Sequence, residues 1–109
     1  MPFIGEYHRR FAGNPQYSPT FPRGGNAALF GEEIFEVDPA VSLTVVVQHK
    51  NIEDTSWTNL VSLSSLTSGV NTATASAIKE LLRFAYTVNG TNPEDSVYSN
   101  TLAPSWRPY

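Results

Sequence analysis

The chain carries few residues whose types and spacing could support catalysis or metal binding. Its two histidines, His8 and His49, are far apart in the sequence, and no G-x-S-x-G motif supplies a serine nucleophile. The absence of cysteine excludes disulfides, thiolate catalysis and zinc–thiolate sites. Neither a His-x-His pattern nor an EF-hand loop provides metal ligands. We therefore expect a protein that is not an enzyme and has no cofactor or metal site, and we interpret both histidines as structural.

The remaining candidates for acid–base chemistry are three pairs of neighbouring acidic residues: Glu32-Glu33, Glu53-Asp54 and Glu94-Asp95. A glycosidase needs two carboxylates that face each other across a cleft. Neighbouring residues on a strand point to opposite faces of the sheet, and the second and third pairs lie in predicted loops. We expect solvated carboxylates, with weak calcium binding by Glu53, Asp54 and Asp95 as the alternative.

The tryptophans Trp57 and Trp106 have two interpretations. Exposed aromatic rings on a sandwich could stack on sugars, which would indicate a carbohydrate-binding or tail-fibre-type adhesion domain. Alternatively, Trp57 belongs to the core, because it begins a predicted strand after a polar loop. Trp106 lies between Pro104 and Pro108, a setting that suits an anchor for a terminal segment. We favour the second interpretation and keep the adhesion domain as the alternative function.

The charge balance argues against a nucleic-acid partner, and the lack of a long apolar stretch argues against a membrane partner. The net charge is −3, whereas nucleic-acid-binding domains are usually basic. Residues 1–26 nevertheless carry Arg9, Arg10 and Arg23 against the single acid Glu6, so a basic segment precedes an acidic remainder. No stretch approaches the roughly 20 apolar residues of a membrane span, and the first residues lack the layout of a signal peptide. We expect an intracellular protein.

Alternating hydrophobicity predicts several strands joined by turns. The clearest is residues 42–50, SLTVVVQHK, in which every second residue is apolar or histidine. The five predicted strands are residues 27–37, 42–50, 57–63, 80–88 and 97–103. A glycine inside a strand often marks a bulge, so we expect one near Gly31. Residues 64–71 are expected to form a loop, and residues 72–79 a short edge strand or a loop.

Residues 1–26 differ from the rest of the chain. Four prolines and four glycines disfavour both a helix and a central strand there. The same residues include six large apolar side chains, which a free, solvated linker would not carry. We interpret residues 1–26 as an extended arm that lies on its own sandwich or on a neighbour. Residues 27–109 are predicted to form one domain, an antiparallel all-β sandwich of jelly-roll or immunoglobulin-like type with an aromatic C-terminal tail.

Three parts of the chain together carry a family resemblance. They are FPRGGNAALF (residues 21–30), VVVQHKNIEDTSWTNL (45–60), and KELLRFAYTV (79–88) followed by TLAPSW (101–106). A strand ends in a lysine-containing polar loop, a tryptophan strand follows, and then comes a strand of the Arg-Phe-x-Tyr type. In this order the segments resemble small β-sandwich virion proteins of tailed bacteriophages, of the head decoration or capsid cement type. The resemblance transfers no catalytic residues.

The resemblance implies a capsid accessory protein that binds the assembled shell and bridges capsomers. Its partners would be the major capsid protein or other virion proteins, and it would reside in the virion after assembly in the host cytoplasm. It also implies a homo-oligomer, either a dimer or a trimer. Aromatic and arginine side chains are enriched at interface centres, and several weak contacts together would hold the protein on the shell. The residues expected to bind the partner are Phe3, Tyr7, Arg9, Arg10, Phe11, Tyr17, Trp106 and Tyr109.

Overall fold

The computed structural model describes residues 5–9, 16–37, 41–66, 69–90 and 96–107. This part of the chain forms nine strands and no helix. The strands are β1 (Gly5–Arg9), β2 (Gln16–Tyr17), β3 (Phe21–Pro22), β4 (Ala27–Val37), β5 (Ser42–Lys50), β6 (Thr58–Leu66), β7 (Gly69–Ala75), β8 (Leu81–Asn89) and β9 (Ser96–Arg107).

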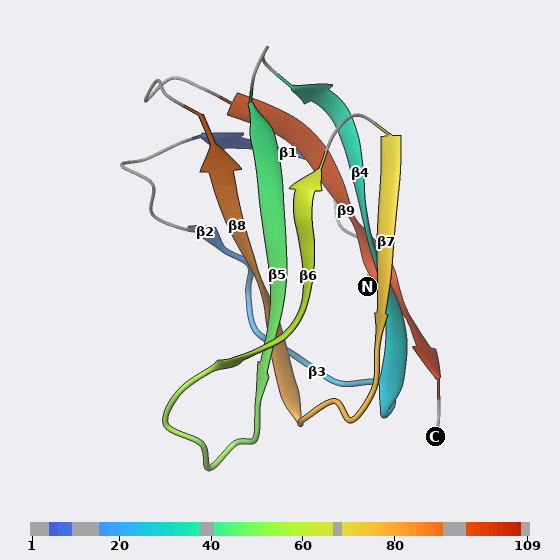
Figure 1. Ribbon diagram of the computed structural model, residues 1–109. Helices are drawn as coiled ribbons and strands as arrows, with labels where there is room; N and C mark the ends of the chain where they lie inside the picture. Colours follow the sequence, from blue (N-terminus) through green and yellow to red (C-terminus); the bar gives the residue numbers. More distant parts are fainter. Residues whose placement is uncertain (1–4, 10–15, 38–40, 67–68, 91–95, 108–109) are drawn as a thin grey trace.

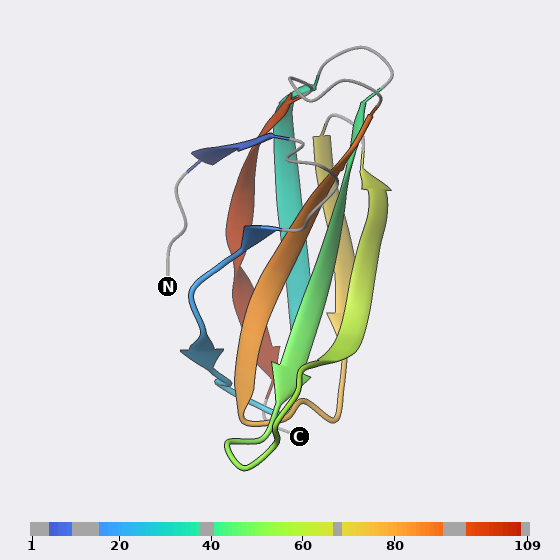
Figure 2. The same ribbon diagram turned by 90° about the vertical axis from the view of Figure 1, so that its left-hand side faces the viewer.

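The strands form two antiparallel sheets packed face to face, which confirms the predicted β-sandwich (Figures 1 and 2). One sheet has the order β1-β9-β4-β7, and we call it the β4 sheet. The other has the order β2-β8-β5-β6 with β3 also paired to β8, and we call it the β5 sheet. Each sheet buries one face, so alternation along its central strands decides which side chains enter the core.

The core lies between β5 and β8 on one side and β4 on the other. Leu43, Val45 and Val47 of β5 are fully buried, while the residues between them are partly exposed. Phe30 of β4 packs edge-on against Phe84 of β8, with ring centroids 6.2 Å apart. Full burial of a side chain of this kind stabilises the fold by about 1.5–3 kcal/mol. The strand predicted over residues 42–50 is therefore confirmed, together with its inward face.

The described parts of the predicted arm pair with the chain's own sandwich. β1 pairs with β9 in the β4 sheet, whereas β2 and β3 pair with β8 at the edge of the β5 sheet. Ser18 reinforces the second contact, since its N–H donates to the Phe84 carbonyl at 2.9 Å and its Oγ accepts from the Phe84 N–H at 2.8 Å. Phe21 is buried and stacks on Phe84, with ring centroids 5.4 Å apart. Residues 16–22 thus follow β8 closely (Figure 2).

The prediction of a loop over residues 64–71 is wrong for most of that segment. β6 continues to Leu66, which pairs with Leu43, and β7 begins at Gly69. Serine and glycine gave the segment a loop-like composition. Pairing with β5 and β4 overrides that weak local preference, because strand propensity depends strongly on neighbours. The alanine-rich stretch that follows is part strand and part loop, since β7 ends at Ala75.

The last strand is longer than predicted. β9 continues through Arg107 and includes Pro104, which we expected to break the chain into an irregular tail. The pairing of β4 with β9 changes register between Leu29 and Gly31, opposite the segment that contains Pro104. Proline is tolerated at such a bulge, because the N–H it lacks is not needed for the ladder. The bulge predicted near Gly31 is only partly confirmed, because the register shift beside Gly31 puts the extra residue in β9. The extra residue of β4 lies further along the strand, between Ile34 and Glu36.

Candidate functional site

A stack of aromatic and cationic side chains lies on the outer face of the β5 sheet. Arg83 of β8 follows the buried Leu82 and therefore points away from the core. Its Cζ lies 3.9 Å from the centroid of the Tyr17 ring and 4.6 Å from that of Trp57. Lys50 places its Nζ 5.3 Å from the Trp57 centroid. With the two amides described next, these residues form what we call the Arg83 cluster: Tyr17, Gln48, Lys50, Trp57, Asn59 and Arg83.

The order of the strands explains how the cluster is assembled. Gln48 of β5 is the direct partner of Arg83 on β8 and of Asn59 on β6. The Arg83 Nε–H donates to Gln48 Oε1 at 2.8 Å, and Gln48 Nε2 donates to Asn59 Oδ1 at 3.1 Å. β2 brings Tyr17 to the other side of β8. The Arg83 side chain is consequently held by two rings and one amide before any partner arrives.

Trp57 corrects an expectation, because it is not a core residue. It is half-buried, directly before β6, and its ring has Arg83 and Lys50 as cationic neighbours. Two charged groups could not accompany the ring into the core without large desolvation costs. The buried core residues of β5 and β6 include Val47 and Leu63 but not Trp57. The indole therefore belongs to the outer face of the β5 sheet.

The cluster has the chemistry of an interaction surface. Tyr17 is 51% exposed, and Arg83, Lys50 and Trp57 are partly exposed. Cation–π contacts of this kind contribute about 0.5–1 kcal/mol at exposed sites. Tyrosine, tryptophan and arginine are the residue types most enriched where protein interfaces are energetically strongest. The six residues include two cations and no carboxylate, so the surface presents fixed positive charge beside aromatic area.

His49 is buried near the end of β5, beside the segment that leads into β8. The imidazole is 8% exposed, and its Nδ1 accepts a hydrogen bond from the Lys79 N–H at 3.1 Å. Burial lowers the pKa of His49 below its ordinary value of 6.5, and the Lys79 charge lowers it further, against an opposing effect of Asp54. The histidine is therefore held neutral with Nδ1 as an acceptor, as a structural residue.

The loop acid Asp54 is more organised than predicted. Its Oδ2 accepts from the Asn51 N–H at 2.9 Å and lies 3.7 Å from Lys79 Nζ. Its carbonyl accepts from Lys50 Nζ at 3.3 Å. Asp54 thus shapes the loop rather than pointing freely into solvent. Among the described side chains, no group of three histidine or acidic residues is placed to hold a metal ion, and Glu94 and Asp95 lie outside the described residues.

Glu32 is a second feature that the sequence did not reveal. Its side chain is fully buried between the sheets, while the neighbouring Glu33 is partly exposed. The Glu32 carboxylate accepts from Ser99 Oγ at 2.6 Å and from Thr101 Oγ1 at 2.7 Å. The Thr101 hydroxyl is also hydrogen-bonded to the phenol of Tyr86 in the opposite sheet. This enclosed network links the two sheets and is best understood as structural.

Trp106 anchors the C-terminal segment, as the favoured interpretation predicted. Its ring meets Phe30 edge-on, with centroids 6.3 Å apart. A Cβ on Gly24 would lie 2.6 Å from the Trp106 Cδ1, so the segment Arg23-Gly24-Gly25 passes directly against the indole. A groove of about 260 Å³ beside it is lined by Phe21, Pro22, Pro104 and Trp106.

The predicted contact residues do not form one group within the described structure. Tyr17 belongs to the Arg83 cluster, and Trp106 packs toward the core from the other sheet. Tyr7 and Arg9 lie on β1, where their backbones pair with Tyr98 and Ser96. The other four, Phe3, Arg10, Phe11 and Tyr109, lie outside the described residues. Gln48, Lys50, Trp57, Asn59 and Arg83 were not predicted as contact residues.

Comparisons with protein-family models, with curated proteins and with solved structures gave no match. In the described part of the chain, no helix is long and apolar enough to cross a membrane.

Proposed function

We propose that this chain is a non-catalytic virion structural protein that binds an assembled capsid surface and bridges its subunits, as a cement or decoration protein does. The observation that supports a binding role is the Arg83 guanidinium, which is held against Tyr17 and Trp57 on the outer face of a sheet. The identity of the partner, a viral shell, rests on the resemblance of the three sequence segments.

The fixed geometry of the cluster favours binding to a protein surface. Immobilising a flexible side chain on association costs about 0.5–1.5 kcal/mol. In the free protein the Arg83 Nε already donates to Gln48 and the guanidinium already lies against two rings. Much of the side chain's conformational freedom is therefore lost before a partner binds. Its terminal nitrogens can donate hydrogen bonds to carboxylate or carbonyl groups of a partner.

The adhesion alternative has weaker support. A sugar ring stacks on the free face of an aromatic side chain, yet the Arg83 guanidinium lies 3.9 Å from the Tyr17 centroid and 4.6 Å from the Trp57 centroid. Trp106 packs against Phe30 and lines a groove that also contains prolines. Glycan-array binding that disappears in a Trp106→Ala variant would favour adhesion over shell binding.

The proposal is tested by purifying particles of the virus whose genome encodes the chain and counting the protein by quantitative mass spectrometry. A cement protein should occur in numbers comparable to the major shell protein. A head-to-tail connector or tail component would occur in far fewer copies. Absence from purified particles would contradict the proposal.

A further inference from the structure

The two strands at one side of the sandwich contain no charged residue. β6 is the last strand of the β5 sheet and β7 the last strand of the β4 sheet, and both lie on the same side of the molecule (Figure 1). The whole of residues 58–78, which contains both strands, has no Asp, Glu, Lys, Arg or His. Interface centres are depleted of charge in the same way.

β7 lacks the features that normally keep an edge strand from pairing. Natural edge strands are commonly protected by lysine, proline or a bulge. The β7 sequence, GVNTATA, has neither charge nor proline, and its seven residues pair with β4 without a register shift. Among the described strands β7 has β4 as its one sheet neighbour, so its other edge is available for a fifth strand from outside.

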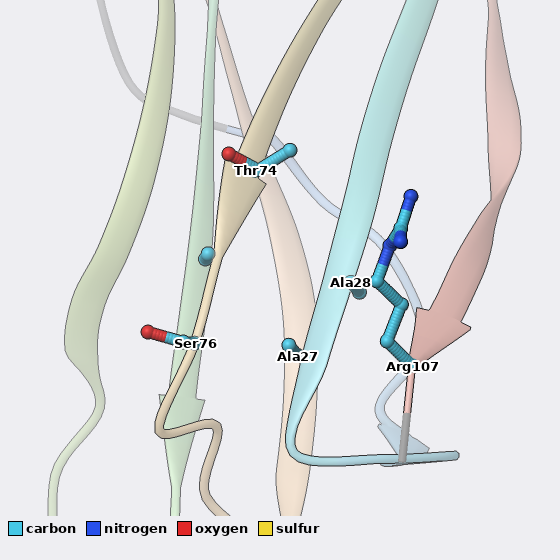
Figure 3. A pocket seen from close by; sticks show the side chains of 6 residues that line it. Ala27, Ala28, Thr74, Ser76 and Arg107 are labelled. Carbon is cyan, nitrogen blue, oxygen red and sulfur yellow. The ribbon is translucent and has the colours of Figure 1, made fainter. Parts of the chain in front are cut away.

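The outer face of β7 carries an exposed apolar side chain and a hollow. Val70 is 59% exposed and shares its face with Thr72 and Thr74, because alternate residues of a strand point the same way. At the other end of the strand is a cavity of about 340 Å³ (Figure 3). Its lining residues are Ala27, Ala28, Thr74, Ala75, Ser76 and Arg107, all of them small except the arginine.

We propose that β7 pairs antiparallel with β7 of a second copy of this chain, about a two-fold axis at Thr72. This register uses all seven residues of the strand. It places Val70 of each copy opposite the second copy's Thr74, beside the hollow, so the same contact forms twice, as a two-fold interface requires. Thr72 meets its own counterpart, and an uncharged residue there avoids the repulsion that identical charges would cause.

The pairing would join two four-stranded sheets into one continuous sheet. The two-fold axis of an antiparallel pair stands perpendicular to the sheet, so both β5 sheets lie on the same side of the joined sheet. The two Arg83 clusters would then face one common surface, and simultaneous engagement would strengthen weak contacts. The pairing itself does not depend on the cluster being a binding site.

The test begins with the molecular mass of the full chain, measured by sedimentation equilibrium over a range of concentrations. A dimer of the 12.0 kDa chain should approach 2 × 12.0 = 24.0 kDa and dissociate on dilution. A monomer at the highest soluble concentration would overturn the proposal. So would open-ended assembly, because a two-fold β7 contact closes on itself.

Charged variants at Thr72 test the register. Thr72 is exposed, so Thr72→Lys and Thr72→Asp should each remain folded by circular dichroism and sediment at 12.0 kDa. An equimolar mixture should recover the dimer mass, because opposite charges then meet at the axis. Ser105→Lys is the control, since Ser105 is exposed on β9, two strands away from β7, and this variant should dimerise normally. A Thr72→Lys variant that stays dimeric, or a mixture that stays monomeric, would overturn the register.

Discussion

The packing of Arg83 between two rings predicts a measurable energetic coupling between Tyr17 and Arg83. The guanidinium Cζ lies 3.9 Å from the Tyr17 centroid, within the range of a cation–π contact. Because both side chains are partly solvated, the contact should contribute about 0.5–1 kcal/mol. Arg83→Ala also removes the Trp57 contact and the Gln48 hydrogen bond, so its total cost should be larger, about 2 kcal/mol.

A double-mutant cycle isolates the coupling. Urea unfolding of the wild type, Tyr17→Ala, Arg83→Ala and the double variant gives four free energies of unfolding. The double variant should lose about 0.5–1 kcal/mol less than the sum of the two single variants. Tyr17→Ala combined with Ile52→Ala is the control, since Ile52 is 68% exposed in the loop after β5 and its effect should be additive.

The result that would refute the reasoning is additivity of the Tyr17 and Arg83 substitutions. Distant pairs add within roughly 0.3–0.5 kcal/mol, so a coupling energy indistinguishable from that of the control pair would show that the stack is not formed in solution. The claim that Arg83 is held in place before binding would then fail.

Other features of the structure give further predictions. Because burial and then the Lys79 charge lower the pKa of His49, the unfolded chain takes up a proton first as the pH falls. The free energy of unfolding should therefore decrease below about pH 6.5, by at most about 1.4 kcal/mol per pH unit. His49→Gln should lack this decrease in urea unfolding, and an identical pH profile would contradict the assignment. Gly24→Ala should destabilise the fold by about 1–3 kcal/mol and change the near-ultraviolet circular dichroism, because the new Cβ would lie 2.6 Å from Trp106; an unchanged midpoint would show that the segment is not packed there. Phe84→Ala, which removes a core ring that is 1% exposed, should cost about 3–5 kcal/mol in the same assay.

The strands with clear period-two patterns could be predicted from the sequence. Residues 42–50 form β5 with the predicted bounds, and the strand predicted over 80–88 is β8, Leu81–Asn89. These strands lie at the centre of a sheet with one buried face, so apolar and polar residues alternate along them in step with burial. Gly31 predicted a register shift near its position but not the strand that holds the extra residue, which is β9.

The edge strands and the irregular segments could not be read in the same way. β7 is exposed along much of its outer face, so little apolar alternation marks it, and tertiary pairing determines its extent. Pro104 suggested the end of the last strand, because the sequence does not show that a register shift would accommodate it.

The Arg83 cluster could be predicted only in part from the sequence. Alternation places Gln48, Lys50 and Arg83 on outer faces, but which of them meet depends on the register between β5 and β8. Trp57 was assigned to the core because hydrophobicity alone does not distinguish a buried ring from one that contacts cations. Glu32 looked like a surface acid, and its hydroxyl partners, Ser99 among them, come from a strand far along the chain. Long-range pairing of this kind leaves no local signal.

The central claim is that the Arg83 cluster binds an assembled shell. The most direct measurement is cosedimentation of the labelled protein with purified virus particles from which it has been stripped, comparing wild type, Arg83→Ala and the Ser105→Ala control. We predict saturable binding of wild type and control, and an affinity roughly 30-fold lower for Arg83→Ala, which corresponds to about 2 kcal/mol at an interface centre. Equal binding of wild type and Arg83→Ala would contradict the assignment of the surface, and no binding of the wild type would contradict the proposed function itself.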